Sequence, residues 1–132
     1  MFEIDEKKRI ASEFLDAIGH GRIDEAMALL NDDVQYWIAG DLPMSGTHRK
    51  EAMHHLIGAL RQMFDGPLVI RPTSMVGEAN SVAVEAVGAG KTLGGKPYNN
   101  HFHFLFEFDQ GNRILALREY MDTALARATF QP

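Results

Sequence analysis

Two glutamate side chains are placed where they could carry acid/base chemistry. Side chains alternate between the two faces of a strand, and in the last predicted strand Glu119 shares its face with Leu115 and Leu117. Glu85 alternates in the same way with small apolar residues of an earlier strand. If both faces are buried, burial raises the pKa of each carboxyl group and repulsion separates the two values. One glutamate could then donate a proton near neutral pH while the other accepts it; the alternative is that both face solvent or pair with arginines.

A histidine and the polar end of a long strand could complete this site. His55 lies on the flank of the apolar face of a predicted helix, beside two alanines that leave room for it to face a cavity; a surface position is the alternative. In the stretch 98–108, four phenylalanines share one strand face, which indicates the core. Tyr98 and Asn100 continue that face towards one end, where we expect a cavity to open.

The opposite face of the same strand carries a candidate metal motif. His101, His103 and Glu107 have the spacing His-x-His-x3-Glu, which resembles the first metal motif of the cupins. No histidine follows His103, so the third imidazole of that family is missing, and the helical first half disagrees with an all-β barrel. A metal site needs both its ligand count and its geometry. We therefore expect no metal centre and predict that this face is exposed or covered by a second subunit.

Composition and charge narrow the classes of function. The chain has 132 residues, 13 Lys+Arg against 18 Asp+Glu, and no cysteine. This length favours one domain over residues 1–132, and the lack of excess positive charge argues against nucleic-acid binding. A chain without cysteine has no thiol nucleophile, disulfide or zinc ribbon. The charged N-terminal segment is unlike a signal peptide, and no apolar run reaches the roughly 18 residues of a membrane span. We expect a cytoplasmic protein that binds neither nucleic acid nor membrane.

The elements that must position these residues follow from the apolar periodicity. Spacings of three and four residues predict helices, and alternation predicts strands. The expected helices are 6–18, a short one after Asp24, and about 49–64; the expected strands are 34–39, 68–75, 81–89, 98–108 and 114–122. Pro72 interrupts one strand and indicates a sheet edge or a bulge. Helices followed by antiparallel strands are typical of the α+β class, with a curved sheet around the helices and a pocket between them.

The order of the motifs resembles a known family. Its members are the SnoaL-like, ketosteroid isomerase-like proteins of the NTF2-like superfamily. The likeness rests on Gly19-x-Gly21-x-Ile-Asp-Glu-Ala, then Leu-Leu-Asn-Asp-Asp-Val, an aromatic strand, a glycine-containing loop before the third helix, and the closing Arg118-Glu-Tyr-Met-Asp122. It covers nearly the whole chain. The resemblance implies an NTF2-like (cystatin-like) cone, in which a curved, mostly antiparallel sheet wraps around N-terminal helices and encloses a pocket.

This chain lacks the catalytic residues of two subfamilies. The helix tyrosine of the ketosteroid isomerases falls on Phe14 and their general-base aspartate falls near Trp37, so we do not expect that mechanism. Limonene epoxide hydrolases are similar around Tyr36, which matches a water-positioning tyrosine. The arginine and one aspartate of their catalytic Asp–Arg–Asp set are absent here, and Glu119 is the carboxylate that remains. We do not expect epoxide hydrolysis by that route.

The strongest local likeness is to the phenazine-biosynthesis A/B proteins. It lies in the segments 84–91, 100–102 and 118–121. The resemblance implies that Glu119 is the acid/base group and that His55 and Tyr98 line the pocket. A serine of that family's third helix is replaced by Ala59 here.

The residues and the resemblance together predict a small-molecule-binding protein. We expect a cofactor-free acid/base enzyme, of the isomerase, cyclase, condensing or hydrolase type, acting on a small apolar or cyclic substrate. Glu119 and His55 are the expected catalytic residues. The expected ligand-contacting residues are Phe14, Tyr36, Trp37, Leu60, Glu85, Tyr98, Asn100 and Met121. A non-catalytic ligand-binding or protein-interaction module of the same fold is the alternative. The aromatic, histidine-bearing outer sheet face predicts a homodimer.

Overall fold

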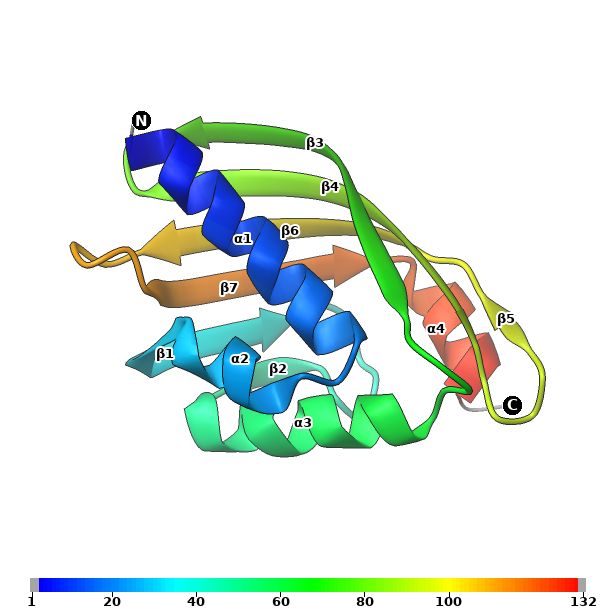
Figure 1. Ribbon diagram of the computed structural model, residues 1–132. Helices are drawn as coiled ribbons and strands as arrows, with labels where there is room; N and C mark the ends of the chain where they lie inside the picture. The colour runs from blue at the N-terminus through cyan, green and yellow to red at the C-terminus, as the bar shows by residue number, and fades with distance from the viewer. Residues whose placement is uncertain (1–2, 131–132) are drawn as a thin grey trace.

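A computed structural model describes residues 3–130 and shows helices packed beside one large sheet (Figure 1). The helices are α1 (Glu3–Gly19), α2 (Ile23–Ala28), α3 (Lys50–Gln62) and α4 (Thr123–Phe130). The strands are β1 (Leu30–Ile38), β2 (Gly46–His48), β3 (Val69–Glu78), β4 (Ser81–Lys91), β5 (Pro97–Tyr98), β6 (His101–Phe108) and β7 (Ile114–Met121). This arrangement confirms the predicted α+β class.

The sheet is curved and the helices gather on one side of it. Its strand order is β2-β1-β7-β6-β4-β3, and the short strand β5 pairs with the last residues of β4. β1 and β7 run parallel, and the other pairs among the described strands are antiparallel. α1 crosses one face of the sheet, α3 lies on the β1–β2 side, and α4 lies at the end where β5 is found (Figure 1). None of the helices of residues 3–130 is long and apolar enough to cross a membrane.

The core forms where the apolar stripe of α1 meets the phenylalanine face of β6. All four phenylalanines of that face are buried, as the alternation predicts. Phe14 of α1 packs edge-on against Phe106, with ring centroids 6.1 Å apart. α1 ends at Gly19, where a Cβ would lie 2.0 Å from the carbonyl oxygen of Leu68. Only glycine lets the chain entering β3 approach this closely, and Leu68 N donates to Gly19 O at 3.0 Å.

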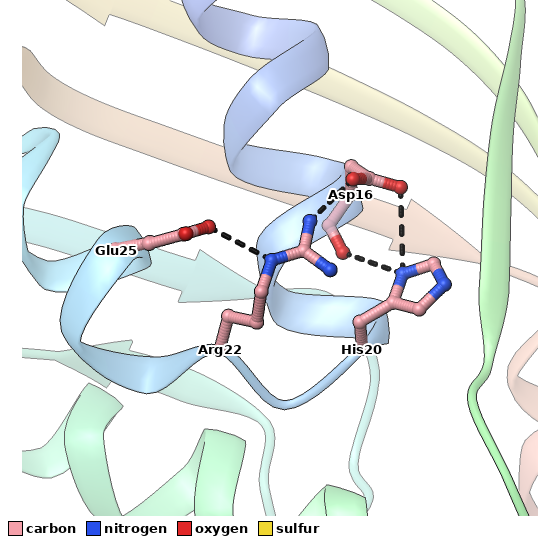
Figure 2. Close-up of polar contacts among 4 residues, drawn as sticks. All are labelled: Asp16, His20, Arg22 and Glu25. Atoms are coloured by element: carbon pink, nitrogen blue, oxygen red, sulfur yellow. Dashed lines mark hydrogen bonds and ion pairs between the residues drawn. The ribbon is translucent and has the colours of Figure 1, made fainter.

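Polar side chains join the end of α1 to the start of α2 (Figure 2). Arg22 Nε lies 2.8 Å from Glu25 Oε2, and the same guanidinium pairs with Asp16. His20 Nδ1 lies 3.0 Å from the carbonyl oxygen of Asp16. These side chains are exposed, and ion pairs at the surface contribute little to stability. The cluster connects two helices and contributes nothing to the pocket lining described below.

The observed strands depart from the predicted ones in the division of 98–108 and in the face taken by Leu115, and they agree with the prediction at Pro72. The stretch 98–108 is two strands, β5 and β6, separated at Asn99 and Asn100. β3 is an edge strand whose register shifts between Pro72 and Ser74, as the proline indicates. Near the start of β7 a register shift buries Ile114 and leaves Leu115 40% exposed. The expected inward position of Leu115 is therefore wrong. β2 and α4 were not expected.

Candidate functional site

A mostly apolar pocket lies between the helices and the inner face of the sheet. It holds about 870 Å³ of empty space, counted with its opening to solvent. α1, α3 and α4 contribute side chains, as do β1, β3, β5, β6 and β7. Three side chains in its described lining carry an oxygen atom: Tyr36, Tyr98 and Glu119. A concave apolar site with a few polar groups is the usual form of a small-molecule site.

Glu119 is the acidic group of this pocket. It lies on β7 opposite Phe104 of β6 and Ile38 of β1, and only 8% of it is exposed. Burial raises the pKa of the Glu119 carboxyl from its ordinary 4.5 to about 7, and the hydrogen bond from Tyr36 opposes that rise. Since the pKa lies near neutrality, both the carboxylic acid and the carboxylate are available to chemistry at pH 7.

Tyr36 fixes one oxygen of that carboxyl group. It lies on β1, and its hydroxyl donates to Glu119 Oε1. Burial, followed by the charge of Glu119, raises the pKa of Tyr36 well above its ordinary 10. The phenol therefore stays protonated and remains a donor to Oε1, which leaves Glu119 Oε2 for a ligand.

Tyr98 forms a second polar position in the pocket. It lies on β5, is 3% exposed, and its ring packs against Phe64 and Phe130 with centroids 5.9 and 4.9 Å away. The Nδ2 group of Asn100 donates to the Tyr98 hydroxyl at 2.8 Å. Asn100 is itself buried and lies behind the pocket lining, so its expected contact with ligand is replaced by a contact with Tyr98.

Three of the remaining predicted ligand residues do line the pocket. They are Phe14, Leu60 and Met121. Trp37 does not, because it points to the outer sheet face, where its ring lies 5.3 Å from that of Tyr120. Tyr36, its neighbour in the strand, takes the inner face.

The expected inward position of Glu85 is wrong. The buried side chains of β4 are Val82, Val84 and Ala86, so Glu85 is exposed on the opposite face, opposite His103 in the sheet. Both faces of β4 are apolar enough to be buried, and alternation alone does not distinguish them. The two-carboxylate site therefore does not assemble.

The expected inward position of His55 is also wrong. α3 buries Met53 and Ile57, and Leu60 on the same side lines the pocket. A residue two positions from Ile57 is turned by about 200° around the helix, so His55 is exposed, near the ring of His54 at 6.0 Å.

The candidate metal motif does not form a site. His101 and His103 are exposed on the outer face, and Glu107 pairs with Arg118 at 2.7 Å. A strand rises about 3.3 Å per residue, which separates His101 from Glu107 by roughly 20 Å. Over residues 3–130 there is no group of three or more histidine, aspartate or glutamate side chains that could hold a metal ion.

Residues of α4 that sequence reasoning missed close one end of the pocket. Ala126 and Phe130 belong to its lining. The signal for this helix was Asp122, whose Oδ1 accepts a hydrogen bond from Leu125 N at 3.1 Å and so caps the first turn. The alternation of β7 runs up to the cap, which hides the start of the helix.

The comparisons with known proteins agree with this fold. The model of the SnoaL-like domain family matches residues 11–117. An NTF2-like protein of Burkholderia xenovorans LB400 is 26% identical, with a TM-score of 0.78 over 98% of this chain and 99% of that one. Bal32a, from a soil-derived mobile gene cassette, is 17% identical with a TM-score of 0.86 over 98% and 100% of the two chains.

A LEH-like epoxide hydrolase of M. tuberculosis is 21% identical, with a TM-score of 0.78 over 97% of this chain and 91% of that one. At these identities the last two proteins share the fold alone. No curated protein matches the chain. Because the family model covers most of its length, the chain belongs to the SnoaL-like domain family.

Proposed function

We propose that the protein is a cofactor-free acid/base enzyme in which Glu119 transfers a proton on a small, mostly apolar substrate. The observation that carries this proposal is the burial of one carboxyl group in an apolar pocket, which raises its pKa to about 7. A carboxyl group of this kind can serve as the acid or base of an isomerisation, a cyclisation, a condensation or a hydrolysis. His55 and Glu85 take no part in the proposal, because both are exposed.

The proposed step uses the free oxygen of Glu119. As a carboxylate, Oε2 takes a proton from a C–H next to a carbonyl group, and the electron pair moves into the enolate. The carboxylic acid exchanges its proton with solvent through the pocket opening and then returns a proton to another carbon, so that no net proton is gained or lost over an isomerisation. Tyr36 holds Oε1 throughout and keeps the carboxyl group oriented.

A non-catalytic ligand-binding module is the second candidate. It is favoured by the observation that Glu119 is the single carboxyl group in the described pocket lining. The fold itself does not decide between binding and catalysis.

Deuterium exchange tests the proposal without knowledge of the natural substrate. The probe is 2-tetralone in D2O, whose α-protons are followed by 1H NMR with wild-type protein, Glu119→Gln and Glu85→Gln. General acid/base catalysis typically contributes 10²- to 10⁴-fold, so Glu119→Gln should lose about 100-fold or more of the catalysed exchange. Glu85→Gln is the matched control and should exchange like the wild type.

Two results would contradict the proposal. Catalysed exchange that survives Glu119→Gln at neutral pH would remove Glu119 from the mechanism. Saturable binding of 2-tetralone with no exchange above buffer would favour the binding module.

A further inference from the structure

Asn100 is a fully buried amide at the junction of β5 and β6, and its orientation is fixed by backbone groups. It is 1% exposed. Its Oδ1 accepts from His101 N at 2.7 Å and from Asp122 N at 3.2 Å. Backbone N–H groups only donate, so the amide oxygen, not the NH2 group, must lie on this side.

The NH2 group of Asn100 therefore faces Tyr98. It donates to the carbonyl oxygen of Asp122 at 3.1 Å and to the Tyr98 hydroxyl oxygen at 2.8 Å. An amide NH2 group does not accept hydrogen bonds. The Tyr98 oxygen is the acceptor in this pair, and its own hydrogen must point elsewhere.

The hydroxyl hydrogen of Tyr98 therefore points into the pocket. Within residues 3–130 the other polar contact of the hydroxyl is Met121 Sδ at 3.9 Å, and Met121 lines the pocket. A thioether is a weak acceptor, so a ligand oxygen at this place would replace a poor hydrogen bond with a good one.

We infer that Asn100 is a positioning residue that directs the Tyr98 hydroxyl hydrogen into the pocket, so that the pocket selects apolar ligands carrying an acceptor oxygen, such as a ketone. The inference rests on the proposed function in that it names the substrate class of the same pocket. The ketone oxygen would accept from Tyr98 while its carbon skeleton lies among the apolar side chains.

Two further features keep Tyr98 a donor. Its ring is held by Phe64 and Phe130, so the hydroxyl cannot swing away from Asn100 without breaking both ring contacts. Burial raises the pKa of Tyr98 to about 12; the hydrogen bond from Asn100 opposes this rise, and the charge of Glu119 adds to it. The phenol thus keeps its hydrogen at physiological pH.

The test compares two probes of the same shape. They are 2-tetralone and its exocyclic-methylene analogue, in which CH2 replaces the carbonyl oxygen. Equilibrium binding of each is measured to the wild type, Tyr98→Phe, Asn100→Asp and the control Tyr120→Phe, an exposed tyrosine of β7. The carbonyl stretch of bound, 13C-labelled 2-tetralone is recorded by infrared difference spectroscopy.

Loss of one hydrogen bond predicts a specific pattern. Tyr98→Phe should weaken 2-tetralone binding by about 2- to 10-fold, leave the methylene analogue unchanged, and move the carbonyl band to higher wavenumber. Asn100→Asp should do the same although the hydroxyl is still present, because a carboxylate accepts its hydrogen and turns it away from the ligand. Tyr120→Phe should change neither probe.

The inference is overturned if Tyr98→Phe affects both probes equally or neither, or if the carbonyl band does not move. These outcomes stand even if Asn100→Asp fails to fold. Binding needs no turnover, so the proposed function and this inference fail separately. Ketone selectivity without deuterium exchange contradicts only the acid/base proposal, whereas exchange without an effect of Tyr98→Phe contradicts only the role of Tyr98.

Discussion

Glu119 is the residue on which the proposed chemistry depends, and its burial lowers the stability of the folded state. The carboxyl group is buried among apolar side chains and is stabilised by one hydrogen bond from Tyr36. Burial disfavours the charged form. A group held in this way reduces the stability of the fold at any pH at which the unfolded chain would ionise it.

The sign of this effect gives a pH-dependent prediction. Well below pH 4.5 Glu119 is protonated in both the folded and the unfolded state and contributes no pH dependence. Between pH 4.5 and about 7 the unfolded chain releases the proton that the folded chain keeps, so stability falls as pH rises. Each pKa unit corresponds to about 1.4 kcal/mol, and the full loss above pH 7 is about 3 kcal/mol.

Glu119→Gln removes the ionisable group and therefore the loss of stability that the wild type undergoes as the pH rises. Its free energy of unfolding relative to the wild type should increase from pH 4 to pH 8 by about 3 kcal/mol, as measured by urea unfolding. Glu85→Gln controls for the loss of one surface carboxyl group. A difference between Glu119→Gln and wild type that is the same at pH 4, 6 and 8 would contradict the burial of a neutral Glu119.

Sequence patterns placed Glu119 correctly but placed its expected partners, Glu85 and His55, on the wrong face, and the reason is physical. From residue 116 onward β7 keeps a strict period of two, so the burial of Leu117 places Glu119 inside. β4 is apolar on both faces, and which face is inner is decided by the helix packed against it. His55 flanks an apolar stripe, and its exposure is set by how α3 is rotated against the sheet.

At the scale of elements, long periodic segments were predictable and short ones were not. α1, α3 and the long strands have clear periods and were expected. β2 has three residues and α4 eight, too few to establish a period. The position of α4 depends on the packing of Phe130 against Phe64 and Tyr98, which lie outside this helix. These contacts cannot be predicted from the sequence of α4 alone.

The stretch 98–108 keeps one register against β4 on both sides of the division between β5 and β6. Asn100 N and O exchange hydrogen bonds with Gly88 O and N at 3.2 and 2.8 Å, while its side chain bonds the start of α4. Alternation correctly placed Tyr98 and Asn100 on the inner side. It could not show that Asn100 would contact Tyr98 in place of a ligand.

At the scale of the whole molecule, helices cover one face of the sheet and the other face carries exposed rings. Trp37 of β1 and Tyr120 of β7 pack together there, and Tyr120 is 42% exposed. Leu115 on the same strand is 40% exposed. Large apolar groups gathered on an outer face are usually covered by a partner. We propose that a second copy of this chain covers them.

The dimer is tested by sedimentation equilibrium at micromolar concentration. The wild type should have twice the chain mass of 14.7 kDa. Tyr120→Glu places a charge in the proposed interface and should give the monomer mass. Leu93→Glu is the control, because Leu93 is 71% exposed in the turn between β4 and β5, and this variant should remain dimeric. A wild-type protein that sediments as a monomer would contradict the proposed interface.

The most direct test of the central claim is the titration of Glu119 itself. Protein labelled with 13C in the glutamate carboxyl groups is followed by NMR from pH 4 to pH 9, and the signal missing from Glu119→Gln identifies the residue. The account predicts a midpoint at about 7, moved higher in Tyr36→Phe because the hydrogen bond that lowers the pKa is lost. A midpoint at about 5 or below, close to that of an ordinary glutamate, would contradict the account.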